Sequence, residues 1–192
     1  EQFQAACPER FFDVGIAEGC AVSMAAGMAK QGAIPVFAVY SSFLQRAYDM
    51  LIHDVAIDKL HVVLGVDRAG LVGEDGETHH GVFDVAFLDS VPGMTVLAPS
   101  SYAELEGMLE QAVLHVNGPV AIRYPRGGEG AYRGDAGPGH AAVLRQGDDI
   151  TLVSYGILIN DVLEAAELLA AEGVQAEVVK LNVITPLDPE LV

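Results

Sequence analysis

The chain has 192 residues, 51% of them hydrophobic, which suits one domain or one and a half domains with a sizeable core. Its 27 acidic and 10 basic residues give a net charge of −17, which argues against a nucleic-acid partner and against an anionic membrane surface. No apolar run reaches the ~20 residues of a membrane-spanning helix and no signal peptide is recognisable, so we expect a cytoplasmic protein.

Apolar periodicity predicts alternating strands and helices along the first part of the chain. Residues 34–39 form a short apolar run, typical of a strand buried on both faces. Residues 42–56 carry apolar side chains at helical spacing behind a capping box that begins at Ser42. A second buried strand over 61–66 is followed by a long polar loop over 67–81.

The pattern continues into a second unit. The next predicted elements are a helix over 81–90, a strand over 94–98, a helix over 101–116 and a strand over 119–124. Glycine-rich residues 127–139 mark a linker, after which a strand, a helix and a strand are predicted over 150–155, 161–171 and 174–181. We therefore expect an α/β fold, with a mostly parallel doubly wound sheet in residues 1–135, and with the linker and the start of a smaller C-terminal α/β domain in residues 136–192.

Both ends of the chain look interrupted. The sequence begins Glu-Gln, and its last residues are typical of a helix that is just starting, with Asp188 as cap and Pro189 at the first helical position. We expect the chain to be a piece of a longer protein.

The polar loop over 67–81 carries the strongest indication of function. It places Arg68, Asp75 and His79 at the carboxyl end of a buried strand, where α/β sheets bind ligands, and its four glycines allow close backbone approach to a bound molecule. Adjacent His79 and His80 point in different directions, and no Cys or acid has zinc-like spacing, so we predict no metal site. Proton handling or hydrogen bonding by one histidine is the favoured interpretation.

Glu18 lies in a stretch, 13–27, of almost entirely small or apolar residues. Desolvation there favours the protonated carboxyl group, which suits a side chain that exchanges or shares a proton near neutral pH. The structural alternative is an acid that interacts favourably with the dipole of a helix N-terminus.

Other candidates flank predicted strand ends. Tyr40 directly follows a strand, and Phe43 and Arg46 lie on the turn behind it, where Phe43 could equally cover the start of a helix. Arg126 lies just past another strand, where its guanidinium suits a phosphate or carboxylate. A surface ion pair with one of the many acids is the alternative for Arg126.

Several motifs in order closely resemble the 1-deoxy-D-xylulose 5-phosphate synthase family. They are residues 40–49 (YSSFLQRAYD), 67–70 (DRAG), 75–79 (DGETH) and 123–127 (RYPRG). The resemblance runs from about residue 11 to 127 and continues more weakly beyond. It implies a transketolase-like, thiamine-diphosphate-dependent transferase that condenses pyruvate with D-glyceraldehyde 3-phosphate and releases carbon dioxide, in isoprenoid and thiamine precursor synthesis.

The resemblance also implies an organisation in three domains, in a homodimer. The first domain binds the diphosphate and Mg²⁺, the second binds the aminopyrimidine ring, and the third is a smaller α/β domain. This chain corresponds to the second and the start of the third. The Gly-Asp-Gly signature of the first domain is absent from the sequence. We therefore expect the piece to be inactive alone.

The resemblance assigns cofactor and proton-handling roles. Glu18 would hydrogen-bond the aminopyrimidine ring and assist proton transfer there, and Phe43 would lie against that ring. The family usually has histidine two residues after the glutamate, and Cys20 occupies this position. A thiol cannot replace the two-ended hydrogen bonding of imidazole.

The resemblance also assigns substrate roles. Arg68 and Arg126 would hold the phosphate of the aldehyde, and Tyr40 and Arg46 would also contact substrate. The predicted polar network around the reacting carbons consists of Tyr40, Asp75 and His79.

Two alternatives remain open. The chain could belong to another transketolase-like enzyme, such as the β subunit of a 2-oxo acid dehydrogenase, in which Arg68 and Arg126 would be idle. It could instead be a non-catalytic α/β association module that packs its small-residue stretch, 21–29, against a partner chain. The association module is favoured if Glu18 and the polar loop lie on opposite sides of the sheet.

Overall fold

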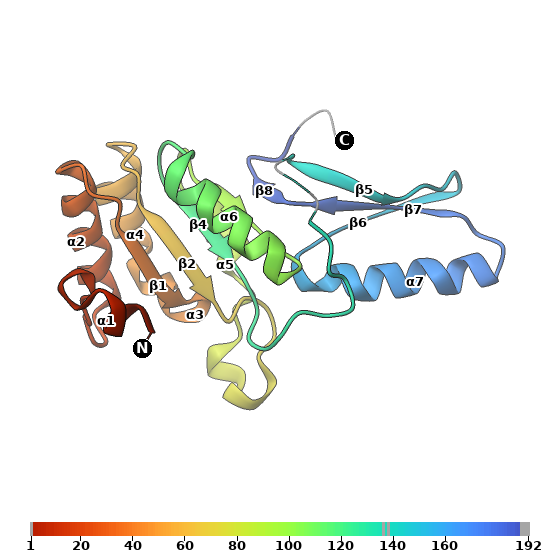
Figure 1. The fold of residues 1–192 in the computed structure, drawn as a ribbon, viewed down its shortest axis with the longest axis horizontal. Helices are drawn as coiled ribbons and strands as arrows, with labels where there is room; N and C mark the ends of the chain where they lie inside the picture. Colours follow the sequence, from red (N-terminus) through yellow and green to blue (C-terminus); the bar gives the residue numbers. More distant parts are fainter. Residues whose placement is uncertain (1, 136, 138, 189–192) are drawn as a thin grey trace.

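The computed structural model describes residues 2–135, 137 and 139–188, which form two α/β units arranged along the long axis of the molecule (Figure 1). The strands are β1 (Val36–Tyr40), β2 (Val63–Asp67), β3 (Thr95–Leu97), β4 (Val120–Arg123), β5 (Ala141–Arg145), β6 (Ile150–Tyr155), β7 (Ala176–Leu181) and β8 (Val183–Thr185). The helices are α1 (Gln2–Ala6), α2 (Glu18–Lys30), α3 (Ser41–Leu44), α4 (Tyr48–Met50), α5 (Asp84–Asp89), α6 (Tyr102–Leu114) and α7 (Ile159–Ala171). The 3₁₀-helical turns are η1 (Pro8–Arg10), η2 (Gln45–Ala47), η4 (Gly73–Asp75), η5 (Glu77–His79) and η6 (Gly156–Leu158), and η3 (Leu51–Ala56) is a π-helical segment.

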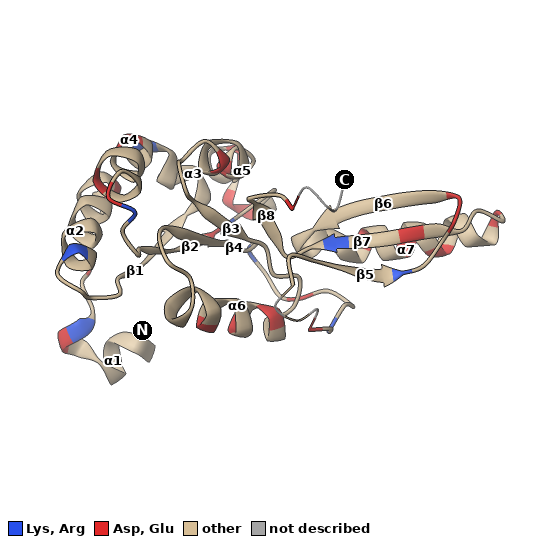
Figure 2. Ribbon diagram, turned by 90° about the horizontal axis from the view of Figure 1, so that it is seen from above, with Lys and Arg blue, Asp and Glu red and all other residues tan. Residues whose placement is uncertain are grey.

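The first sheet has five strands in the order β1-β2-β4-β3-β8. The four strands β1, β2, β4 and β3 are parallel, and β8 is antiparallel to β3. Helix α6 covers one face, while α3 and α5 lie on the other (Figure 2). A mostly parallel sheet with helices on both faces confirms the predicted α/β class.

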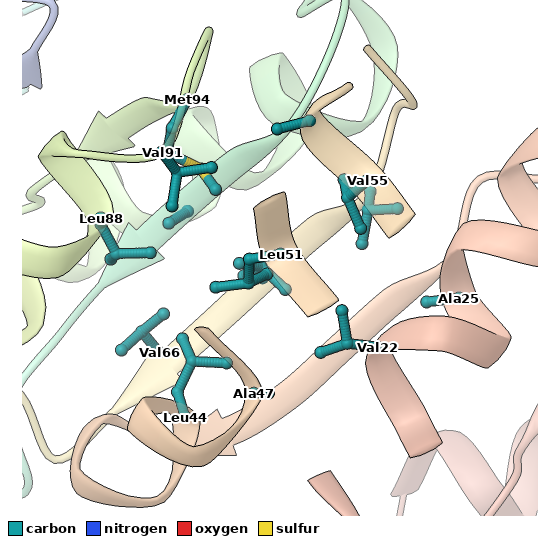
Figure 3. Close-up of a cluster of buried hydrophobic side chains, with 14 of the residues drawn as sticks. Val22, Ala25, Leu44, Ala47, Leu51, Val55, Val66, Leu88, Val91 and Met94 are labelled. Atoms are coloured by element: carbon teal, nitrogen blue, oxygen red, sulfur yellow. The ribbon is translucent and has the colours of Figure 1, made fainter. Parts of the chain in front are cut away.

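The burial pattern explains why these apolar runs form central strands. Side chains of β2 alternate between the two faces: Leu64 and Val66 join the core under α2, α4 and α5, and Val63 joins the core under α6. Figure 3 shows the first of these cores, where Val22 and Leu51 pack with Val66. Burial on both faces requires apolar residues at consecutive positions, which is the pattern that predicted the strands.

The second unit is a three-stranded sheet in the order β5-β7-β6, with α7 packed against it. Strands β6 and β7 are parallel, as a strand-helix-strand unit requires, and β5 is antiparallel to β7. Its core is formed by Ile159, Ala166, Ala176 and Val178. The chain then returns to the first unit, because β8 pairs with β3.

The structure corrects three local predictions and adds two strands. Strand β1, expected to be buried on both faces, is the edge strand of its sheet, and Val36 is 54% exposed. The predicted helix over 42–56 begins at Ser41, and α3, η2, α4 and η3 divide it into short segments. Ser42 therefore lies inside the first turn and does not cap the helix, whose cap position is Tyr40 without a side-chain hydrogen bond. Strands β5 and β8 were not predicted. The helix expected from Pro189 onward lies outside the described residues.

The helix predicted over 101–116 also begins with a capping-box sequence, Ser101 to Glu104, and the structure confirms this capping box in part. Ser101 caps α6, and its hydroxyl oxygen accepts a hydrogen bond from the backbone N–H of Glu104 at 3.2 Å. The Glu104 carboxylate, however, accepts from the backbone N–H of Ser100, at 2.7 Å, and does not return to that of Ser101. Among the described helices, none is both long and apolar enough to cross a membrane.

Candidate functional site

The predicted site residues gather at the carboxyl edge of the first sheet. Tyr40 ends β1 and lies directly opposite Asp67, which ends the neighbouring strand β2. The loop over 68–81 leaves from β2, and Figure 1 shows it in yellow, extending beyond the ends of β2 and β4. Parallel strands end at a common edge, so segments distant in sequence meet there.

An aromatic cluster lies at this edge, where β1 ends and α3 begins. The rings of Tyr40 and Phe43 stack with their centroids 5.4 Å apart. His79 approaches both rings edge-on, with centroid distances of 5.1 Å to Phe43 and 6.2 Å to Tyr40. Arg68 lies 4.0 Å above the ring of Tyr40, and Arg46 lies 5.3 Å from that of Phe43. The two guanidinium groups therefore cover opposite ends of one aromatic surface, where cation–π attraction is favourable.

Glu18 is connected to this cluster through Arg46. Its carboxylate accepts a hydrogen bond from Arg46 Nη1 at 3.2 Å and is 8% exposed, whereas the Arg46 side chain is 53% exposed. Glu18 is also the first residue of α2, so its negative charge interacts favourably with the helix dipole. The two interpretations of Glu18 are thus compatible, because a helix-terminal acid also faces the aromatic cluster.

Arg68, on the loop, and Arg126, just after β4, are both held by acids. Arg68 contacts Asp67 and donates from Nε to Asp75 Oδ2 at 3.1 Å. Partial burial alone would lower the pKa of Arg68, but hydrogen bonds to Asp67 and Asp75 outweigh it and raise the pKa above its ordinary value. Arg126 binds the other oxygen of Asp75 at 3.2 Å and Glu74 at 3.2 Å. Asp75 therefore bridges two guanidinium groups that come from different strands.

The neck of the loop is closed by glycine. Gly70 and Gly81 exchange two backbone hydrogen bonds of 2.7 and 2.8 Å. A Cβ atom on Gly81 would lie 2.5 Å from the Ser41 hydroxyl oxygen and still closer to the carbonyl oxygen of Arg68. Only glycine fits at this position, and the resulting contact fixes the loop against α3.

His80 supports the loop and does not form a metal site with its neighbour. Its Nδ1 atom accepts a hydrogen bond from the backbone N–H of Val72 at 3.1 Å. His79 Nδ1 lies 2.9 Å from the Thr78 hydroxyl and its ring faces the aromatic cluster instead. Over residues 2–135, 137 and 139–188, no group of three or more His, Cys, Asp or Glu side chains is arranged to hold a metal ion.

A groove of about 1230 Å³ runs beside β1, between α2 and the segment that precedes it. Its wall is mostly apolar and includes Phe11, Met24 and Val36, and it ends at Glu18 and Phe43. The aromatic cluster thus separates an apolar groove from the charged loop. Glu18 and the loop are connected through Arg46, Phe43 and His79, so they do not lie on opposite sides of the sheet, the arrangement that would have favoured the association module.

Sequence reasoning missed one buried pair at this edge. Arg123 ends β4 and donates from Nε to Asp84 Oδ2 at 2.7 Å, and from Nη2 to Asp84 Oδ1 at 3.3 Å. The two residues are 39 positions apart, so no local pattern connects them. The signals in the sequence were an acid three residues after the polar loop and an arginine at the end of a predicted strand.

Comparison with known proteins agrees with this architecture. Residues 1–128 match the family described as "Transketolase, pyrimidine binding domain", and residues 139–192 match "Transketolase, C-terminal domain". The chain belongs to the transketolase family. Relatives named 1-deoxy-D-xylulose-5-phosphate synthase support this membership. The protein from Chlorobium luteolum is 53% identical over 99% of this chain, and that from Gloeobacter violaceus is 51% identical over 100% of it.

This transketolase-family chain spans about 31% of the length of both relatives. Among solved structures, one described as "Split gene transketolase, inactive beta4 tetramer" has a TM-score of 0.82 and 34% identity, covering 98% of this chain and 62% of that chain. The R525L transketolase of Pichia stipitis has a TM-score of 0.83 over 92% of this chain and 28% of its own, and at 20% identity it supports the fold alone.

Proposed function

We propose that this chain is the pyrimidine-binding part and the start of the C-terminal part of a 1-deoxy-D-xylulose 5-phosphate synthase. Such an enzyme condenses pyruvate with D-glyceraldehyde 3-phosphate and releases carbon dioxide, and its product serves isoprenoid and thiamine precursor synthesis. The observation that carries the proposal is the continuous surface from Glu18 through Phe43 and His79 to Arg68, in a chain 53% identical to a protein of that name.

The groove and its polar end fit the aminopyrimidine ring of thiamine diphosphate. An aromatic ligand of this kind needs a flat apolar contact and a polar group at its edge, which Phe43 and the carboxylate of Glu18 supply at the end of an apolar groove. When bound, thiamine diphosphate supplies the carbon nucleophile and the electron sink of the reaction. We propose that the diphosphate and Mg²⁺ are held by a further domain, as the greater length of the relatives supports.

Glu18 is the proposed proton-handling group. Its carboxyl group would hydrogen-bond the ring nitrogen of the aminopyrimidine and hold or release a proton at that atom. Arg46, at 3.2 Å, would keep the carboxyl group oriented toward the groove. The Phe43 ring would exclude water from the same contact.

The loop is the proposed acceptor site. Arg68 and Arg126 present guanidinium groups suited to bidentate binding of a phosphate, and carboxylate oxygens of Asp75 now lie where phosphate oxygens could bind. Tyr40 and His79 would hydrogen-bond the reacting carbonyl and hydroxyl groups, together with Asp75. Arg46 would also contact substrate from the groove side.

We further propose that the longer protein is a cytoplasmic homodimer. Residues such as Phe12, Ile16 and Val36 expose apolar side chains beside β1, which supports burial against another chain or domain. The related split-gene transketolase chain, solved as an inactive tetramer, supports both self-association and lack of activity without further domains.

The proposal is tested with the longer protein and with the 192-residue chain, each supplied with thiamine diphosphate, Mg²⁺ and pyruvate. We expect the longer protein to use D-glyceraldehyde 3-phosphate with a kcat/KM about 10²-fold or more above that for unphosphorylated D-glyceraldehyde, because two arginines lose their anion without the phosphate. The short chain is expected to form no product, as measured by carbon dioxide release and product chromatography.

Two results would contradict this. Turnover by the short chain would refute its inactivity. Equal use of both acceptors would instead favour another transketolase-like enzyme, in which Arg68 and Arg126 bind no phosphate.

A further inference from the structure

The Asp84–Arg123 pair is a buried charged pair at the carboxyl edge of the first sheet, and no role assigned above uses it. The side chain of Asp84 is 1% exposed and that of Arg123 is 11% exposed. Their two-point contact, at 2.7 and 3.3 Å, fixes both the position and the plane of the guanidinium group. A buried arginine in this geometry has little freedom to move.

The pair connects the segment that follows the loop with the segment that carries Arg126. Asp84 follows three residues after Gly81, which closes the neck of the loop, and Arg123 precedes Arg126 by three residues. Between them, the backbone N–H of Ala69 donates to the carbonyl oxygen of Tyr124 at 3.0 Å. The β4 exit segment and the loop are thus joined at the base by the Asp84–Arg123 pair.

A second contact joins the same two segments at the loop tip. There Arg126 Nη1 binds Asp75 Oδ1 at 3.2 Å. Arg126 is 36% exposed and its two acid partners are on a loop, so this tip contact alone holds it weakly. The base of the segment that carries Arg126 is held by the buried Asp84–Arg123 pair and by the Ala69–Tyr124 hydrogen bond.

The second unit covers the same pair. The ring of Tyr155, at the end of β6, lies 5.4 Å from the Arg123 guanidinium carbon. Gly156, with a φ of +61°, follows directly, and a Cβ atom there would lie 3.9 Å from Arg123 Nη1. The C-terminal unit therefore shields the Asp84–Arg123 pair from solvent on one side.

We propose that Arg123 is a positioning residue, anchored by Asp84, that sets the Arg126 guanidinium for the phosphate of the acceptor. The inference rests on the proposed function, and it adds a residue that does not itself touch substrate. Arg123 lies three residues before Arg126 and does not contact the phosphate itself. It holds the segment after β4 against the loop, so that the phosphate binds to a site that is already formed.

The test is Arg123→Lys in the longer protein, with Arg145→Lys as the matched control. Arg145 also pairs with an acid, Glu167 at 2.7 Å, but it lies on β5, which belongs to the other sheet. Lysine keeps the charge of Arg123 and loses the two-point contact. Steady-state kinetics are measured for pyruvate, for D-glyceraldehyde 3-phosphate and for unphosphorylated D-glyceraldehyde.

We expect Arg123→Lys to raise the KM for the phosphorylated acceptor about tenfold, the effect of misaligning one charge-assisted hydrogen bond. The KM for pyruvate, the kcat, and the kcat/KM for the unphosphorylated acceptor are expected to stay within about twofold of wild type, because these do not depend on the phosphate contact. Arg145→Lys should leave all four values unchanged. Amide hydrogen exchange should be faster over residues 70–81 in Arg123→Lys, with α6 unaffected.

Each other outcome overturns the inference. Equal losses with both acceptors would mean that Arg123 serves general stability, and wild-type kinetics with unchanged exchange would mean that it positions nothing. If the wild-type protein itself does not prefer the phosphorylated acceptor, the proposed function fails as well. If it does and Arg123→Lys keeps that preference, only the inference about Arg123 fails.

Discussion

Glu18 shows how one side chain satisfies a structural and a chemical requirement together. It begins α2, where its charge stabilises the helix, and it is shielded from water while bordering the groove. Its one charged partner in the described ion pairs, Arg46, is half exposed and can reorient without cost to the core. The carboxyl group is therefore placed to exchange hydrogen-bond partners when a ligand enters.

Replacing Glu18 by Gln in the longer protein should lower kcat about 10²–10⁴-fold, the usual loss when one acid–base group is removed. The measurement is kcat at saturating pyruvate and acceptor. Glu106→Gln, an exposed position on α6, is the matched control and should behave as wild type. A kcat unchanged by Glu18→Gln would remove Glu18 from the mechanism.

The loop over 68–81 is held mainly by contacts at its two ends. The Gly70–Gly81 hydrogen bonds close its neck, and Arg68, with a φ of +59°, directs the chain out of β2. A non-glycine residue with positive φ is disfavoured and persists only where its surroundings hold it, here through Asp67 and Asp75. The element thus presents its charged side chains from a rigid base.

Gly81→Ala should destabilise the folded chain by about 1–3 kcal/mol, because the new methyl group overlaps Ser41 and the carbonyl of Arg68. The free energy of unfolding in urea measures the loss. Gly107→Ala is the control: this glycine lies within α6 with open space around its Cα, and alanine there should be neutral or stabilising by up to about 1 kcal/mol. Equal stability of the two variants would argue against close packing at the neck.

The two units are joined by a buried ion pair. Lys180 on β7 is 0% exposed, and its Nζ atom lies 3.0 Å from Oε2 of Glu104 on α6. Tyr132, from the segment between the units, donates its hydroxyl to Glu104 Oε1 at 3.0 Å, and Lys180 also contacts Asn182. Three parts of the chain, namely α6, the segment between the units and the end of β7, therefore meet at one largely buried polar cluster.

Lys180→Met should cost about 3–5 kcal/mol, because it leaves the Glu104 carboxylate buried without its cation, and adding Glu104→Gln should recover much of the loss. Urea unfolding of the two single variants and the double variant measures the coupling. If the loss of stability in the double variant equals the sum of the losses in the two single variants, the pair does not couple the two units.

The same pair predicts a pH dependence. Burial lowers the pKa of Lys180 below its ordinary value of 10.5, against the opposing attraction of Glu104. Between the folded pKa and 10.5 the unfolded chain binds more protons, so the cost of burying the ammonium group is relieved as pH rises through that interval. The wild-type free energy of unfolding, measured relative to Lys180→Met, should therefore increase toward higher pH. A constant or falling difference would contradict the lowered pKa.

Local pattern was sufficient for much of the architecture. Short apolar runs predicted β1, β2 and β4. In β2 and β4 the physical reason is burial on both faces, which needs apolar residues at consecutive positions. The candidate side chains were also recognisable before the fold was known, since polar groups directly after such strands lie at the ligand-binding edge. Their proposed roles remain predictions until the variants are measured.

Long-range packing settled the rest. Strands β5 and β8 depend on antiparallel partners far along the chain, and β8 joins a sheet whose other strands end some 60 residues earlier. The Asp84–Arg123 and Glu104–Lys180 pairs likewise join residues that no periodic pattern relates. A sequence pattern indicates which side chains of one helix or strand are buried. The partner of a buried charged group comes from another helix or strand, so it is determined only when these elements pack together in the tertiary structure.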